Sequence, residues 1–163
     1  MLGVVLGNGP SREYYDRKGD YVIGCNIPGD QFSVDATVIS DEEIVWVLKN
    51  DPSLIKVPII VSNKALEKMK ELRIDSLFTI HHVFNVKVWH NSAHYAAEFL
   101  LDYGCDELHI WGCDSMFNAD LSSTTDAFVN KNVDADRFIR QWRGVWDDIH
   151  IKHPYVNIQA MRL

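Results

Sequence analysis

The chain has 163 residues, about the length of one domain. Hydrophobic residues make up 47% of it and charged residues 24%, a composition that excludes a disordered or collagen-like chain. The formal net charge of −7, from 16 basic and 23 acidic side chains, argues against a nucleic-acid partner, because binding along a duplex needs a basic surface.

Short apolar runs bounded by turn residues predict the strands of the first half. Leu2–Leu6 leads into the tight-turn sequence Gly-Asn-Gly-Pro-Ser at 7–11, which is typical of a buried strand entering a loop. The other strands expected are 21–25, 36–39, 57–61 and a short one at 77–80. Pro58 places its strand at a sheet edge or at a strand start. Helices are expected after residues 40–41 and 62–63, which supply N-caps.

The second half continues the alternation of helices and strands. A helix begins after Asn91 and Ser92 and ends at Gly104, and its apolar residues recur at helical spacing. The strand 107–111 follows and ends in Gly-Cys-Asp at 112–114. A final helix opens at Asp134 or Asp136 and is followed by a strand at 155–158. Residues 115–131 are polar and have no period, which predicts a lid loop.

This alternation predicts an α/β fold. We expect a three-layer, Rossmann-like domain spanning 1–163, with a mostly parallel sheet of about six to seven strands and helices on both faces. Ligands of such sheets bind outside the carboxyl ends of the strands, at a topological switch point. No stretch approaches the roughly 20 apolar residues of a membrane span. The start of the chain has no basic region typical of a signal peptide, and the three cysteines read as reduced thiols, so we expect a cytoplasmic protein.

Polar and glycine residues collect after the predicted strand ends, where a ligand is expected. Glycine lets the backbone approach a ligand closely, and free amides at a helix start favour an anion. The predicted nucleotide-binding residues are Gly7, Asn8, Gly9, Pro10, Ser11, Asn26, Ser40, Asn91 and Ser92. A plain tight turn for the glycines and a helix cap for 91–92 are the alternative interpretations. The loop is not a dinucleotide fingerprint, because Arg12 stands where the third glycine belongs.

Charged residues supply the remaining candidates. Asp114 and Asp41 follow predicted strands and are the candidate catalytic carboxylates, either activating a hydroxyl or holding a divalent metal. Arg137 and Arg140 lie on one edge of the last helix and are candidates for contacting a phosphate. Histidines 81, 82, 90 and 94 are interpreted as surface or half-buried side chains, since no third zinc ligand accompanies them. We assign no residue as a metal ligand, and Mg²⁺ is the one cofactor left open.

Two blocks of sequence resemble known families. The first is Val-Val-Leu-Gly-Asn-Gly-Pro-Ser at 4–11 with Cys25 and Asn26 after the next strand, and the second runs from Asn91 to Gly104 and on to Gly-Cys-Asp at 112–114. Both blocks are similar to those of the bacterial lipooligosaccharide sialyltransferases and of a related family that includes the archaeal-type 6-hydroxymethylpterin diphosphokinases. The resemblance covers residues 2–41 and 88–118.

The resemblance implies a nucleotide ligand. In the sialyltransferases it is a cytidine monophosphate sugar, which places Gly7, Asn8, Gly9 and Asn26 at the nucleotide and Ser92 at its base or phosphate end. The diphosphokinases imply a nucleoside triphosphate with Mg²⁺. The sialyltransferases carry a lid histidine as general base, whereas residues 115–149 here contain none.

The sequence therefore leaves three functions open. The first is a nucleotide- or nucleotide-sugar-binding protein that acts as a small sialyltransferase-like glycosyltransferase. The second is a Mg²⁺-dependent diphosphokinase-like enzyme. The third is a catalytically inactive nucleotide-binding or structural module, which acts through a partner or as a homo-oligomer.

Overall fold

The computed structural model describes residues 1–114 and 135–161, with the first turn of the last helix (135–139) described as backbone only. Its centre is one sheet of seven parallel strands in the order β5-β4-β3-β2-β1-β6-β7. The strands are β1 (Leu2–Leu6), β2 (Tyr21–Cys25), β3 (Ala36–Ile39), β4 (Ile59–Ser62), β5 (Ile80–Phe84), β6 (Glu107–Trp111) and β7 (Asn157–Ala160). The lid predicted at 115–131 lies outside the described residues.

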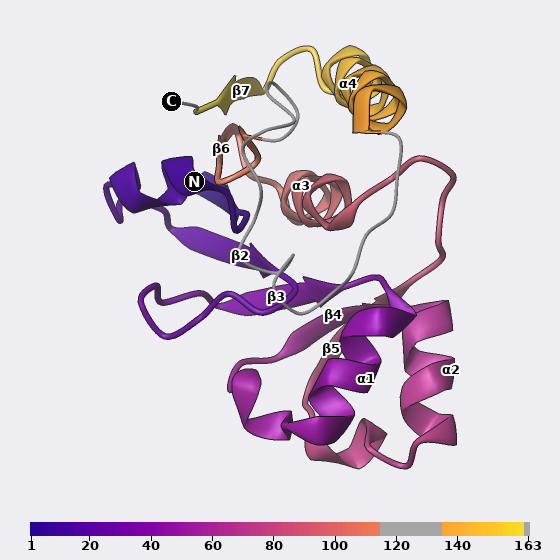
Figure 1. Ribbon diagram of the computed structural model, residues 1–163. Coiled ribbons are helices and arrows are strands. Elements are labelled where there is room, and N and C mark those ends of the chain that lie inside the picture. Colours follow the sequence, from indigo (N-terminus) through magenta and orange to yellow (C-terminus); the bar gives the residue numbers. More distant parts are fainter. Residues whose placement is uncertain (115–134, 162–163) are drawn as a thin grey trace.

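Helices cover both faces of this sheet, as predicted, and make a three-layer architecture (Figure 1). Helices α1 (Glu42–Asn50) and α2 (Asn63–Glu71) pack on one face, and α3 (Ser92–Tyr103) and α4 (Ala135–Lys152) belong to the other. The chain steps outward from β1 to β5 and then returns through α3 to β6, on the other side of β1. The switch point of the fold therefore lies between β1 and β6.

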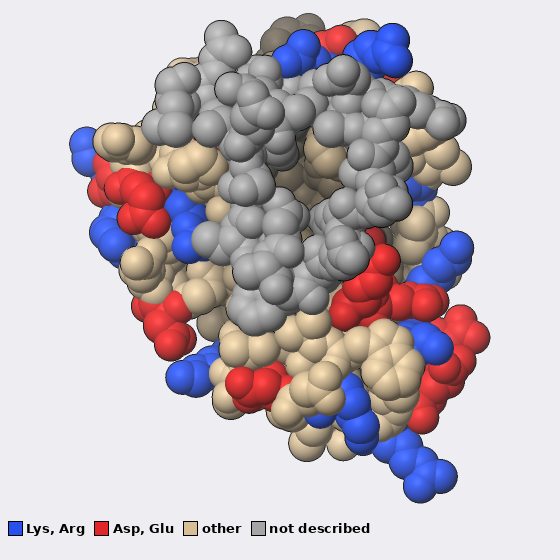
Figure 2. All heavy atoms as spheres, in the orientation of Figure 1, with Lys and Arg blue, Asp and Glu red and all other residues tan. Residues whose placement is uncertain are grey.

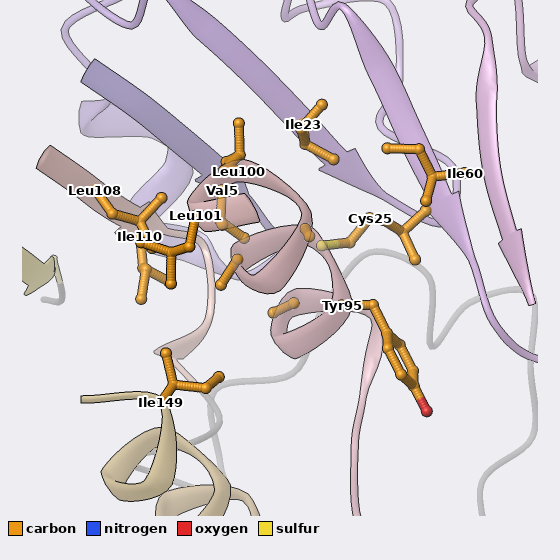
Figure 3. Close-up of a cluster of buried hydrophobic side chains, with 14 of the residues drawn as sticks. Val5, Ile23, Cys25, Ile60, Tyr95, Leu100, Leu101, Leu108, Ile110 and Ile149 are labelled. Carbon is orange, nitrogen blue, oxygen red and sulfur yellow. The ribbon is translucent and has the colours of Figure 1, made fainter. Parts of the chain in front are cut away.

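Alternate side chains of each strand enter different cores, because successive residues of a strand point to opposite faces. On the α3 face, Val5, Ile23 and Ile110 pack with Leu100 of α3 and Ile149 of α4 (Figure 3). On the other face, Ile39 and Val61 pack against α1 and α2. No described helix is both long and apolar enough to cross a membrane.

Loops cover the part of the α1 face that α1 and α2 leave open. The connection from β1 to β2 contains only the 3-10 turn η1 (Pro10–Tyr14), and the connection from β2 to β3 is the irregular segment 26–35. Phe32 of that segment is buried with Leu6 and Val22. The guanidinium groups of Arg12 and Arg17 lie 5.3 and 5.0 Å from the centre of its ring, which holds the two loops together.

Three strand boundaries differ from the prediction. β4 begins directly after Pro58, so the strand-start interpretation of that proline is confirmed, but the edge interpretation is wrong because β4 lies between β3 and β5. β5 begins at Ile80, since residues 75–77 form the 3-10 turn η3. β7 begins at Asn157, since Val156 N–H closes a turn onto the His153 carbonyl at 3.2 Å.

His94 joins α3 to α4 and is completely buried, so its interpretation as a surface or half-buried side chain is wrong. Its Nδ1 accepts the N–H of Asn91 at 2.9 Å, which leaves the proton on Nε2. That nitrogen then donates to the Trp142 carbonyl of α4 at 3.1 Å. Burial lowers the pKa of His94 to about 3. The neutral ring therefore fixes both the start of α3 and the position of α4.

This pKa predicts a pH dependence of stability. His94 is neutral in the folded protein above about pH 3, whereas in the unfolded chain it titrates near 6.5. Because the unfolded state binds the extra proton between these values, the stabilisation is complete above pH 6.5 and is lost as the pH falls. We expect His94 to contribute a slope of ~1.4 kcal/mol per pH unit to the free energy of unfolding.

Urea denaturation of the wild type and His94→Gln between pH 4.5 and 7.5 measures this slope. The variant should be less stable at pH 7.5, by ~1–3 kcal/mol for the lost buried hydrogen bonds. The free energy of unfolding of the variant should also change less with pH, because its unfolded state lacks the proton that His94 binds in the wild type. Equal slopes for the two proteins would contradict the assignment.

Candidate functional site

The loops that follow β1 and β6 are joined by four hydrogen bonds beyond the ends of their strands. Gly7 N–H donates to the Trp111 carbonyl and Gly9 N–H to the Gly112 carbonyl, both at 2.7 Å. Gly112 N–H in turn donates to Ser11 Oγ at 2.8 Å, and Ser11 N–H donates to Asp114 Oδ2 at 2.9 Å. These bonds, which we call the loop clamp, occupy the switch point where a ligand crevice would otherwise lie.

The glycines of the predicted nucleotide loop serve this clamp. A Cβ on Gly7 would strike the carbonyl of Gly112, and a Cβ on Gly9 would lie 2.6 Å from Asp114 Oδ2. Gly112 has a left-handed φ of 72° and would strike Gly7 in the same way. The close approach that requires glycine here is therefore between two segments of the chain. This contact supports the tight-turn alternative for Gly7 and Gly9.

Asn8 and Arg12 connect the same loop to β2. Asn8 Nδ2 donates to the Cys25 carbonyl at 2.7 Å, and its Oδ1 accepts from Arg12 Nη1 at 2.9 Å. Arg12 also donates to the Pro28 carbonyl at 3.2 Å. The Asn8 amide is therefore held by the protein on both its atoms. The bracing role of Arg12 is a feature that the sequence analysis missed, although its i+4 spacing from Asn8 was visible.

Asp114 is fully buried, and one of its oxygens completes the loop clamp. Its other oxygen, Oδ1, is buried without a hydrogen-bond partner in the described structure. The neighbouring Cys113 thiol has its pKa raised to about 12, first by burial and then by the charge of Asp114. The contacts of Asp114 explain a role in fixing the loops, and its catalytic role stays a prediction.

A polar cluster at the ends of β2 and β3 faces the start of α3. Ser92 Oγ of α3 donates to Asn26 Oδ1 at 3.3 Å and lies 2.9 Å from Ser40 Oγ. Asn26 and Ser92 are buried, and Ser40 is half-buried. Since the Ser92 hydrogen goes to Asn26, the Ser40 hydroxyl is the donor of the second bond. These three residues, which we call the Asn26–Ser40–Ser92 cluster, come from three separate elements.

The open groups of this cluster are donors. Within residues 1–114 and 135–161, no acceptor contacts Asn26 Nδ2 or the N–H groups of Ser92 and Ala93. Asn26 has a left-handed φ of 55°, and the hydroxyl of Thr37 supports that turn by donating to the Asn26 carbonyl at 2.8 Å. Free N–H groups at a helix start favour an anionic or carbonyl oxygen.

The remaining predicted residues have other positions. Asn91 caps α3, with its Oδ1 accepting His94 N–H at 3.2 Å, which confirms the cap interpretation. Asp41 stands directly before α1, exposed and without a side-chain cap bond, and Pro10 opens η1. On α4, Arg140 is exposed, and Arg137 is described only by its backbone. The structure therefore brings together 7–11 with 112–114, and 26 with 40 and 92.

The described residues include no group of three or more His, Cys, Asp or Glu side chains arranged to hold a metal ion. A Mg²⁺ ion held largely by substrate phosphates needs only one or two carboxylates. Of the two candidates, Asp41 is exposed and Asp114 is buried in the loop clamp. Among the described residues, Asp41 is therefore the candidate carboxylate with an exposed side chain. A Mg²⁺ ion would fit here only if the substrate phosphates supplied most of its other ligands.

Charges on the visible face are mixed. Over the lower part of the view, where α1 and α2 lie, acidic and basic side chains are interspersed (Figure 2). Comparisons with protein-family models, with curated proteins and with solved structures find no match to this chain.

The loop clamp predicts that Gly9 cannot carry a side chain. Gly9→Ala places a Cβ against Asp114 Oδ2 and the Gly112 carbonyl. We expect it to lower the free energy of unfolding by ~1–3 kcal/mol, the usual effect of overpacking. Gly144→Ala is the matched control, because a Cβ there meets nothing within 4 Å on helix α4. It should stabilise the protein by ~0.5–1 kcal/mol. Equal effects of the two substitutions in urea denaturation would contradict the clamp.

Proposed function

We propose that this chain binds a nucleotide or nucleotide sugar at the carboxyl edge of β2 and β3 and acts as a small sialyltransferase-like glycosyltransferase. The observation that carries the proposal is the Asn26–Ser40–Ser92 cluster, in which Asn26 Nδ2 and the N–H groups at the start of α3 are donors that no described acceptor contacts. The sequence resemblance assigns two of these residues, Asn26 and Ser92, to the nucleotide.

The chemistry of the cluster suits a phosphate. Two N–H groups of the first turn of α3 and the positive end of the helix dipole attract a negative oxygen. Asn26 Nδ2 adds a side-chain donor from a residue that is 8% exposed. The loop clamp and the Asn8–Arg12 pair then form a rigid neighbouring wall, in which most polar groups are already bonded.

Transfer from a nucleotide sugar needs a base for the acceptor hydroxyl. The bond between the sugar and the phosphate breaks, the phosphate keeps the electron pair, and the base takes the proton of the attacking hydroxyl. Asp41 suits this step better than Asp114, because it is exposed and follows Ser40 directly. The donors at the start of α3 would stabilise the leaving phosphate, and Arg140 or Arg137 would add positive charge from the last helix.

A nucleotide-binding module without chemistry is the second candidate. It is favoured by the contacts of Asp114, whose carboxylate is used in the loop clamp, and by the absence of histidine from residues 115–149. A Mg²⁺-dependent diphosphokinase-like enzyme is the third candidate. It would need the triphosphate to supply most of the metal ligands.

A thermal-shift screen with and without Mg²⁺ distinguishes the three. The panel is CMP, CDP, UDP, GDP, ATP and CMP-sialic acid. A ligand at 100 times its Kd stabilises a protein by about 2.7 kcal/mol, which raises Tm by several degrees for a domain of this size. The glycosyltransferase proposal predicts a cytidine-specific shift without metal. A triphosphate shift that requires Mg²⁺ supports the diphosphokinase alternative, and no shift with any nucleotide contradicts nucleotide binding.

Variants of the cluster test where the nucleotide lies. Asn26→Gly removes the side-chain donor while keeping the left-handed backbone accessible, and Ser92→Ala removes the hydroxyl. Asn26→Gly should weaken binding by about 5- to 20-fold, the effect of a lost hydrogen bond to the ligand, and Ser92→Ala should weaken it indirectly, because Asn26 Oδ1 loses its support. Arg73→Gly is the matched control, because Arg73 is also left-handed (φ 56°) but follows α2, outside the cluster. Wild-type affinity in both cluster variants would contradict this location.

A further inference from the structure

The outer edge of β5 is exposed and apolar. β5 is the terminal strand of the sheet, so only β4 pairs with it in the described structure. Ile80 is 38% exposed and Val83 is 42% exposed. Leu77, Val86 and Val88, just before and after the strand, are exposed as well. An edge of this kind, with free backbone groups and apolar side chains, is a template for pairing with another strand.

A β-bulge in β5 places its two exposed apolar side chains on one face. Ile59 and Ile60 of β4 are neighbours, but their partners are Ile80 and His82, so His81 is the extra residue. Parallel partners in register point to the same face of a sheet, and therefore Ile80 and Val83 share the face of α2. The rings of His81 and His82 both lie against Phe99 of α3, on the opposite face.

The charge of this segment also favours pairing. Residues 76–97 contain no aspartate or glutamate, in a chain that has 23 of them. The one lysine of the segment, Lys87, bonds to Glu98 of α3 at 3.0 Å, and His90 lies 3.4 Å from the same carboxylate. Two copies of this segment can therefore approach each other without the repulsion that their net charge of −7 creates elsewhere.

The other edge of the sheet is built differently. β7 has four residues, and Asn157 and Gln159 are exposed polar side chains among them. Short polar strands are a common way to protect an edge from pairing. The two edges of the sheet are therefore not equivalent, and the apolar one is β5.

We propose that the β5 edge pairs with the β5 edge of a second copy of this chain. A two-fold axis makes such a contact self-complementary and sets the two strands antiparallel. With the axis between His81 and His82, Ile80 lies opposite the partner's Val83 on the α2 face. The bulge is what makes this match possible, because residues three apart in a regular strand would point to opposite faces. The two sheets then form one continuous sheet in a closed dimer.

The test is the mass of the full chain in solution, by sedimentation equilibrium at pH 7.5 over a range of protein concentrations. The proposal predicts a monomer–dimer equilibrium. Val83→Lys places a charge at the paired edge and should weaken the dimer at least tenfold. Ile151→Lys is the matched control: Ile151 is 75% exposed on α4, the helix that leads into β7 at the opposite edge of the sheet, and its substitution should leave the dimer unchanged.

Hydrogen exchange of the unaltered chain gives a second measurement that does not depend on the folding of a variant. Amides of residues 80–84 should become more protected as the protein concentration rises. A monomer at every concentration, or a dimer that Val83→Lys does not weaken, would overturn the proposal. Open-ended association would also overturn it, because that result indicates pairing between two different edges rather than a closed dimer.

Discussion

The position of the candidate site depends on the bond between Ser11 N–H and the buried carboxylate of Asp114. It ends a series of four hydrogen bonds that continues the pairing of β1 and β6 beyond the strands. The close approach of these loops leaves no room for a Cβ at Gly7, Gly9 or Gly112. The switch point between β1 and β6 is consequently filled by the protein itself. Polar groups that remain open must lie elsewhere on the carboxyl edge.

The donors that no described residue contacts lie at the carboxyl ends of β2 and β3 and at the start of α3. There the Asn26–Ser40–Ser92 cluster meets the start of α3, whose own position is set by the buried His94 between Asn91 and Trp142. The loop clamp and Arg12 hold the wall beside the cluster, and the α3–α4 contact holds the helix that supplies its N–H groups. The loop clamp and the α3–α4 contact therefore stabilise the fold and also position the residues of the site. A ligand bound here would meet donors that the rest of the described structure already holds in position.

Much of the fold could be predicted from the sequence. Apolar runs ended by glycine, asparagine or serine placed β1, β2 and β3 correctly, because strands buried on both faces need uninterrupted apolar residues. β6 was placed correctly as well, although its residues alternate between half-buried and buried. β5 was misplaced, since its exposed edge removes that requirement. The candidate residues do follow the strands that the sequence predicted. Sequence spacing cannot show, however, which of them bond to other parts of the protein and which keep donors that no described residue contacts. Whether Gly9 makes room for a ligand or for Asp114 depends on a contact 105 positions away along the chain.

The most direct test of this account is a map of backbone and side-chain amide shifts by NMR as CMP is added to the 18.7 kDa chain. The account predicts that the largest shifts occur at the backbone amides of Ser92 and Ala93 and at the side-chain amide of Asn26, which no described acceptor contacts. The amides of Gly7, Gly9 and Ser11 should move little, because they already donate within the loop clamp. Shifts centred on residues 7–12 and 112–114, with the start of α3 unchanged, would contradict it.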